Sequence, residues 1–159
     1  MKAYDLIGYI RQDATTVLNG TGFFVDIAGK SPMNRANELQ VLTASNELPV
    51  IALGYIESSI DVQVKTNTFH KCIMVFLNQG NPDAGIDQST GTDSIDLVCA
   101  EMESLAYDFL KAFFSSATRK TRRYMESGKV KMTREKNILN TTLSGVSIEF
   151  TLTDNNVCF

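Results

Sequence analysis

Apolar and polar residues alternate along this chain with two different periods, which separate helices from strands. Apolar residues recur every three or four positions over Tyr4 to Leu18 and again over Ile95 to Phe113, as on one face of a helix. Val146, Ile148, Phe150 and Leu152 instead alternate with polar residues, as in a strand with one wet face. The pattern predicts two main helices and a sheet on which they pack.

The remaining segments predict further strands and one short helix. Ser31 and Pro32 suit the N-cap and first position of a helix over Met33 to Ser45, the segment that the pattern defines least well. Beyond Lys71, the strand Phe69 to Leu77 is apolar at both odd- and even-numbered positions, which point to opposite faces. It is therefore expected to be a central strand covered on both faces. Further strands are predicted at residues 23–28, 48–57, 60–65, 129–135 and 138–143, a turn at Ser144-Gly145, and a long surface loop at 78–92.

This order of elements is typical of an α+β fold with an antiparallel or mixed sheet, and no linker or repeat divides residues 1–159 into more than a single domain. The longest apolar run, Cys72 to Leu77, is far shorter than the ~20 residues that cross a bilayer. No membrane contact is therefore expected.

The long helix is more apolar than packing on one sheet requires. Leu97, Tyr107, Leu110 and Phe114 lie off its main stripe. They indicate a second contact, either within the chain or with another subunit.

Charge is strongly segregated, although the net charge is only −3. Residues 1–110 carry six Lys/Arg against fourteen Asp/Glu, whereas residues 111–136 carry nine against two. The basic segment Arg119 to Lys136 is the sharpest candidate interaction site. Its candidate residues are Arg119, Lys120, Arg122, Arg123, Lys129, Lys131 and Arg134. It would bind either nucleic-acid phosphates or an acidic protein surface, for which residues 1–110 of a neighbouring copy are a candidate.

Residues for catalysis are sparse. His70 is the single histidine, and Cys72 is expected on the same strand face, but no orienting group or oxyanion hole accompanies them. The three cysteines have no CxxC spacing, the acids of 83–93 do not fit an EF-hand, and the glycines match no nucleotide-binding loop. We expect no enzyme activity, no metal and no cofactor.

The layout of the C-terminal two thirds, roughly residues 48–159, resembles tail-terminator-like ring proteins from the neck and tail of tailed bacteriophages, particularly those of Bacteroidetes, crAss-like phages among them. The resemblance rests on Met74-Val75-Phe76-Leu77, the polar loop 78–92, the helix Ile95 to Phe113, the basic strand Lys129 to Arg134, the strand Gly145 to Thr153, and Cys158.

The resemblance implies a virion protein, synthesised in the bacterial host cytoplasm, that assembles into a closed ring, commonly six- or twelve-fold. Its partners would be copies of itself and neighbouring neck or tail proteins, and DNA would pass through the lumen without sequence-specific binding. The alternative is a small nucleic-acid-binding accessory protein that uses residues 119–136.

Overall fold

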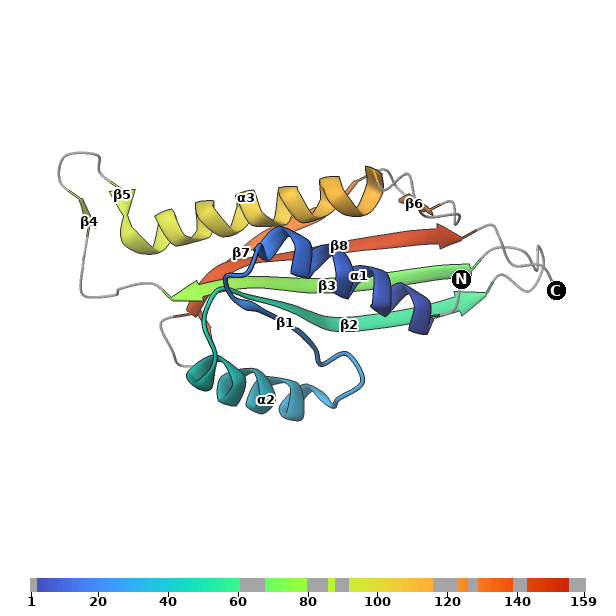
Figure 1. Cartoon of the computed structure of the whole chain (residues 1–159), viewed down its shortest axis with the longest axis horizontal. Helices are drawn as coiled ribbons and strands as arrows, with labels where there is room; N and C mark the ends of the chain where they lie inside the picture. The colour runs from blue at the N-terminus through green and yellow to red at the C-terminus, as the bar shows by residue number, and fades with distance from the viewer. Residues whose placement is uncertain are drawn as a thin grey trace.

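In a computed structural model, a mixed sheet carries helices on both faces (Figure 1). The structure describes residues 3–60, 68–79, 86–87, 92–115, 123–125, 129–138 and 143–154. The helices are α1 (Ala3–Leu18), α2 (Pro32–Ser45) and α3 (Ser94–Ser115). The strands are β1 (Phe23–Asp26), β2 (Val50–Ile60), β3 (Thr68–Gln79), β4 (Ile86–Asp87), β5 (Thr92–Asp93), β6 (Arg123–Met125), β7 (Lys131–Ile138) and β8 (Leu143–Asp154). This architecture confirms the predicted α+β class, and α2 confirms the short helix expected over Met33 to Ser45.

The main sheet has the order β1-β2-β3-β8, and β6 and β7 both pair with the outer side of β8. Among the described strands of this sheet, β1 and β2 pair in parallel and the other pairs are antiparallel. β3 is central, as its apolar sequence predicted. β4 and β5 form a separate two-stranded ribbon next to the start of α3, so the predicted loop 78–92 contains short strands in its described part.

Helices α1 and α3 cover one face of the sheet and enclose the larger core. α1 buries Leu6, Ile10, Ala14 and Leu18, which recur every four residues along one side of the helix. They pack with the helix-facing residues of β3 and β8 and with the buried side of α3. The α3 side contributes Phe109, whose ring centroid lies 5.8 Å from that of Phe76.

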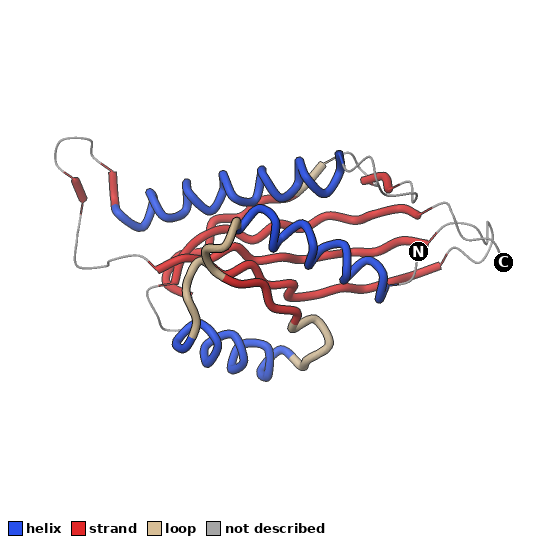
Figure 2. Tube along the Cα trace, viewed as in Figure 1, coloured by secondary structure: helices blue, strands red, loops and turns tan. Residues whose placement is uncertain are grey.

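Helix α2 covers the opposite face, but only at one end (Figure 2). Its single buried residue, Leu39, packs with Val50, Ala52 and Leu77. Further along β3 on this face, Lys71 is exposed and Ile73 is half-buried. The prediction that β3 is covered on both faces is therefore wrong for this part of the strand among the described residues, because α2 is too short to extend over it.

The sequence placed a turn at Ser144-Gly145, and this prediction is wrong. Both residues lie within β8, where Gly145 pairs with Leu77. A Cβ at position 145 would lie 1.9 Å from the carbonyl oxygen of Phe76, so glycine serves here to let two strands approach closely. Of the separate strand predicted for 138–143, Ile138 lies in β7 and pairs with Leu143 of β8, and residues 139–142 lie outside the described part of the chain.

A β-bulge in β2 changes the face to which its side chains point. The register between β2 and β3 shifts between Leu53 and Tyr55, which leaves Gly54 as the additional residue of a bulge. Leu53 faces α1 and α3, whereas Tyr55 faces the α2 side, where Arg35 lies 5.9 Å from its ring centroid. The strand predicted for 60–65 falls, beyond Ile60, outside the described residues.

Candidate interaction surfaces

The structure divides the described part of the predicted basic site between two faces of the sheet. Arg119, Lys120 and Arg122 lie outside the described residues, and Arg123 is described only as part of the β6 backbone, paired with Asp154. In β7, successive side chains point to opposite faces. Val130 and Met132 pack on the larger core, so Arg134 and Lys136 also face α3, while Lys131 faces away from it.

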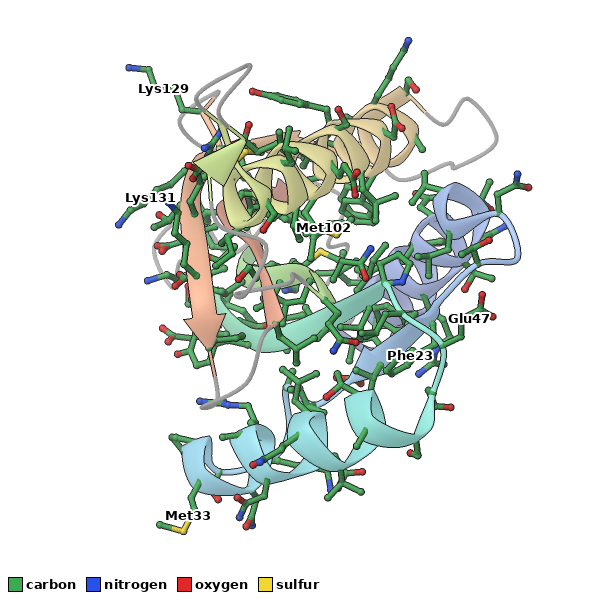
Figure 3. All side chains as sticks on the ribbon, turned by 90° about the vertical axis from the view of Figure 1, so that its left-hand side faces the viewer. Phe23, Met33, Glu47, Met102, Lys129 and Lys131 are labelled. Atoms are coloured by element: carbon green, nitrogen blue, oxygen red, sulfur yellow. The ribbon has the colours of Figure 1, made fainter. Side chains whose placement is uncertain are left out.

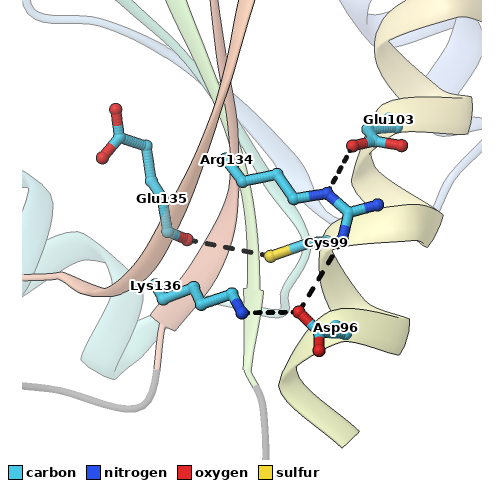
Figure 4. Close-up of polar contacts among 6 residues, drawn as sticks. All are labelled: Asp96, Cys99, Glu103, Arg134, Glu135 and Lys136. Atoms are coloured by element: carbon cyan, nitrogen blue, oxygen red, sulfur yellow. Dashed lines mark hydrogen bonds and ion pairs between the residues drawn. The ribbon is translucent and has the colours of Figure 1, made fainter. Parts of the chain in front are cut away.

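Arg134 and Lys136 are bound to acidic residues of their own chain (Figure 4). The Arg134 guanidinium donates from Nε to Glu103 Oε1 at 2.7 Å, and its Nη1 lies 3.7 Å from Asp96 Oδ1. Lys136 Nζ lies 2.5 Å from the same Asp96 oxygen. Part of the acid–base complementarity seen in the sequence is thus realised between β7 and α3 within one chain.

This network shifts the pKa values of its members. The hydrogen bond from Lys136 lowers the pKa of the Asp96 carboxyl, and the positive charges of Lys136 and Arg134 act in the same direction. The hydrogen bond and charge of Glu103 raise the pKa of the Arg134 guanidinium. The network is a charged clamp that holds β7 to the N-terminal half of α3.

Lys129 and Lys131 lie beside β8 and point away from the body of the protein (Figure 3). They line a shallow hollow of about 340 Å³ together with Val130, Glu149, Phe150 and Thr151. Glu149 pairs with Lys71 of β3 at 3.4 Å. The hollow therefore mixes both signs of charge, and it is less basic than the sequence cluster suggested.

His70 and Cys72 do share the helix-facing side of β3, as expected, but both are buried. His70 is 1% exposed, and its Nδ1 lies 2.7 Å from Ser58 Oγ on the neighbouring strand. Burial raises the pKa of the Cys72 thiol to about 12, so the reactive thiolate is scarce at neutral pH. This arrangement suits packing better than nucleophilic chemistry.

The structure separates the off-stripe apolar residues of α3 into two groups. Leu110 and Phe114 pack on the larger core, where the Phe114 ring centroid lies 6.1 Å from that of Phe150. Leu97 and Tyr107 remain 52% and 63% exposed. The within-chain alternative therefore holds for Leu110 and Phe114, and a contact with another subunit stays a prediction for Leu97 and Tyr107.

Helix α2 carries a second exposed apolar surface, which the sequence analysis missed. Met33 is 75% exposed and Val41 is 66% exposed, and Met33 points away from the body (Figure 3). The signal was the weak amphipathicity of this segment, in which four large apolar residues are spread over more than one side of the helix. It could be interpreted only once the buried side of the helix was known.

Four negative findings complete the description of this chain. Among the described residues there is no cluster of three or more metal-ligating side chains, and no helix in that part of the chain is long and apolar enough to cross a membrane. No model of a known protein family matches this chain, and no curated protein matches it in sequence.

Proposed function

We propose that this chain is a structural virion protein that forms a homo-oligomeric ring in the neck or tail of a tailed bacteriophage, as a tail terminator or head-tail connector. The observation that carries the proposal is the presence of exposed apolar side chains on α2 and on α3, which lie on opposite faces of the sheet. A subunit with two different exposed apolar surfaces suits head-to-tail assembly. Such an assembly closes into a ring when the rotation from one copy to the next divides a full turn evenly.

The segments behind the resemblance also form one structural unit. The end of β3 pairs with β8, β7 pairs with the other side of β8, and α3 packs across β3 and β8. This unit provides a rigid platform on which surface loops and helices can contact neighbouring rings. The proposal for a virion neck or tail rests on this layout.

The test is the assembly state of the purified protein. Mass photometry and negative-stain microscopy at micromolar concentration should show closed rings of uniform size. High salt and the combined Arg119→Glu, Lys120→Glu, Arg122→Glu and Arg123→Glu variant should weaken assembly if charge contributes to the contact. A protein that stays monomeric at every concentration would contradict the ring.

The competing hypothesis is an accessory protein that binds nucleic acid through residues 119–136. A gel-shift titration over a range of salt concentrations measures it, because phosphate contacts give an affinity that falls steeply with salt. We expect at most weak binding, since Arg134 and Lys136 already pair with Asp96 and Glu103. A monomer with tight, salt-sensitive DNA binding would favour this hypothesis over the ring.

A further inference from the structure

The outer surface of α2 forms an uncharged stripe. Its members are spaced at i, i+4, i+7, i+8 and i+11 and lie on one side of the helix, and all are exposed. They are Met33, Asn37, Gln40, Val41 and Ala44, called here the α2 stripe. Exposed helix surfaces usually carry charge, and protein interfaces are depleted of it at their centre. The α2 stripe therefore has the composition of an interface.

The charged residues of α2 are engaged away from this stripe. Arg35 lies over the Tyr55 ring, and Glu38 Oε2 lies 3.8 Å from Lys30 Nζ. Leu39 alone is buried against the sheet. A 14-residue helix attached by so small a buried surface gains little from its own chain, so a second contact on the outer side would stabilise it.

Helix α3 has a comparable exposed stripe on the other side of the molecule. Leu97, Ala100, Ser104 and Tyr107 follow the spacing i, i+3, i+7 and i+10, and all four are exposed. This set is called here the α3 stripe. Its central residues are small, which permits another helix to approach to the ~8–10 Å axial distance of close helix pairs.

The two stripes match in length and in composition. At 1.5 Å per residue the α2 stripe is about 17 Å long and the α3 stripe about 15 Å. Both combine two large apolar side chains with uncharged polar or small residues. Within one chain they cannot meet, because the sheet lies between α2 and α3 (Figure 1).

We propose that the α2 stripe of one copy packs against the α3 stripe of the next copy, and that this contact repeats around the ring. The inference rests on the proposed ring. A heterologous contact of this kind covers both stripes in every subunit, whereas an α2–α2 dimer would leave every α3 stripe exposed.

Charge favours the same pairing over an α3–α3 dimer. The exposed side of α3 carries Glu101 and Asp108 beside the stripe, against Lys111 near its end. Two copies of α3 in contact would bring these carboxylates together, which costs binding energy. The uncharged α2 stripe offers them no like charge.

Disulfide trapping tests the pairing directly. Gln40→Cys and Ser104→Cys each place one thiol in the interior of a stripe. Cys158→Ser removes a third thiol from the background, and Cys72 and Cys99 are buried. Mixing the two single variants under mild oxidation should give a covalent dimer, whereas each variant alone should give none. A dimer from either variant alone would overturn the heterologous contact.

A second experiment introduces a negative charge into each stripe and compares it with a matched control variant. Met33→Glu and Leu97→Glu each put a carboxylate into one stripe and should weaken assembly at least tenfold in mass photometry. Ile60 is as exposed as Leu97, at 52%, and lies on neither stripe, so Ile60→Glu should leave the ring intact. Circular dichroism checks that each variant is folded.

The outcomes separate this inference from the proposed function. If the wild-type protein forms no ring, the proposed function fails. If rings form but persist in folded Met33→Glu and Leu97→Glu variants, the stripes are not the contact and only the pairing is overturned. Rings that are lost in both variants and kept in Ile60→Glu, together with the mixed disulfide, support the pairing.

Discussion

Arg134 of β7 donates a hydrogen bond from its Nε to Oε1 of Glu103 on α3 at 2.7 Å. This bond joins the outer strand of the sheet to the helix that covers it. It also engages one of the seven predicted interaction residues within its own chain. The C-terminal part of the basic segment thus joins β7 to α3 within the chain. A role in assembly stays a prediction for residues 119–131.

The first prediction concerns Asp96, the other acid of this clamp. Lys136→Met removes the hydrogen bond and the closest positive charge, so the lowered pKa of the Asp96 carboxyl should rise toward its usual value. Arg134→Met should raise it less, because that contact is longer, at 3.7 Å. NMR titration of the carboxyl carbon measures both, and an unchanged pKa in Lys136→Met would refute the attribution.

The sign of the linked pH dependence follows from the lowered pKa. The clamp stabilises the folded state above the unfolded pKa of an aspartate, near ~3.9, and this contribution is lost as the pH falls through the lower folded value. Unfolding in urea between pH 6 and pH 2 should therefore show a smaller acid-induced loss in Asp96→Asn than in the wild type. An identical loss would mean that other carboxyl groups carry the acid sensitivity.

The second prediction compares two glycines. Gly145→Ala forces a Cβ to within 1.9 Å of the Phe76 carbonyl oxygen, so it should lower the free energy of unfolding by ~1–3 kcal/mol or more. Gly8 is exposed in α1 and a Cβ there meets nothing within 4 Å. Gly8→Ala should raise the free energy of unfolding by ~0.5–1 kcal/mol, because alanine loses less backbone entropy in a helix. Urea unfolding of both variants decides, and equal effects would contradict the close approach.

The third prediction concerns His70 and Ser58. His70→Gln disturbs a buried side chain and should cost ~1–3 kcal/mol of stability, and Ser58→Ala should cost about 1 kcal/mol for the lost hydrogen bond. Neither substitution should change the oligomeric state. A hydrolytic activity that His70→Gln abolishes while the protein stays folded would reverse the non-enzymatic interpretation.

The sequence by itself determined the elements whose buried side is wide and regular. α1, α3 and β8 each bury one continuous face, so the period of their apolar residues carries enough signal to predict them. The central place of β3 followed in the same way, because residues on both of its faces are apolar. α2 was the least well-defined segment because it buries a single leucine, and one residue sets no period.

The tertiary structure alone decided which residues are available for contact. Gly145 resembles a turn residue in sequence, but the carbonyl of Phe76, almost 70 positions away, makes it a strand residue. Leu97 and Leu110 have the same chemistry, yet only Leu110 packs on the core. Arg134 belongs to a basic run, yet its partners are on α3. Local patterns fix periodicity, whereas exposure and charge pairing depend on residues that are brought together only when the sheet and helices assemble.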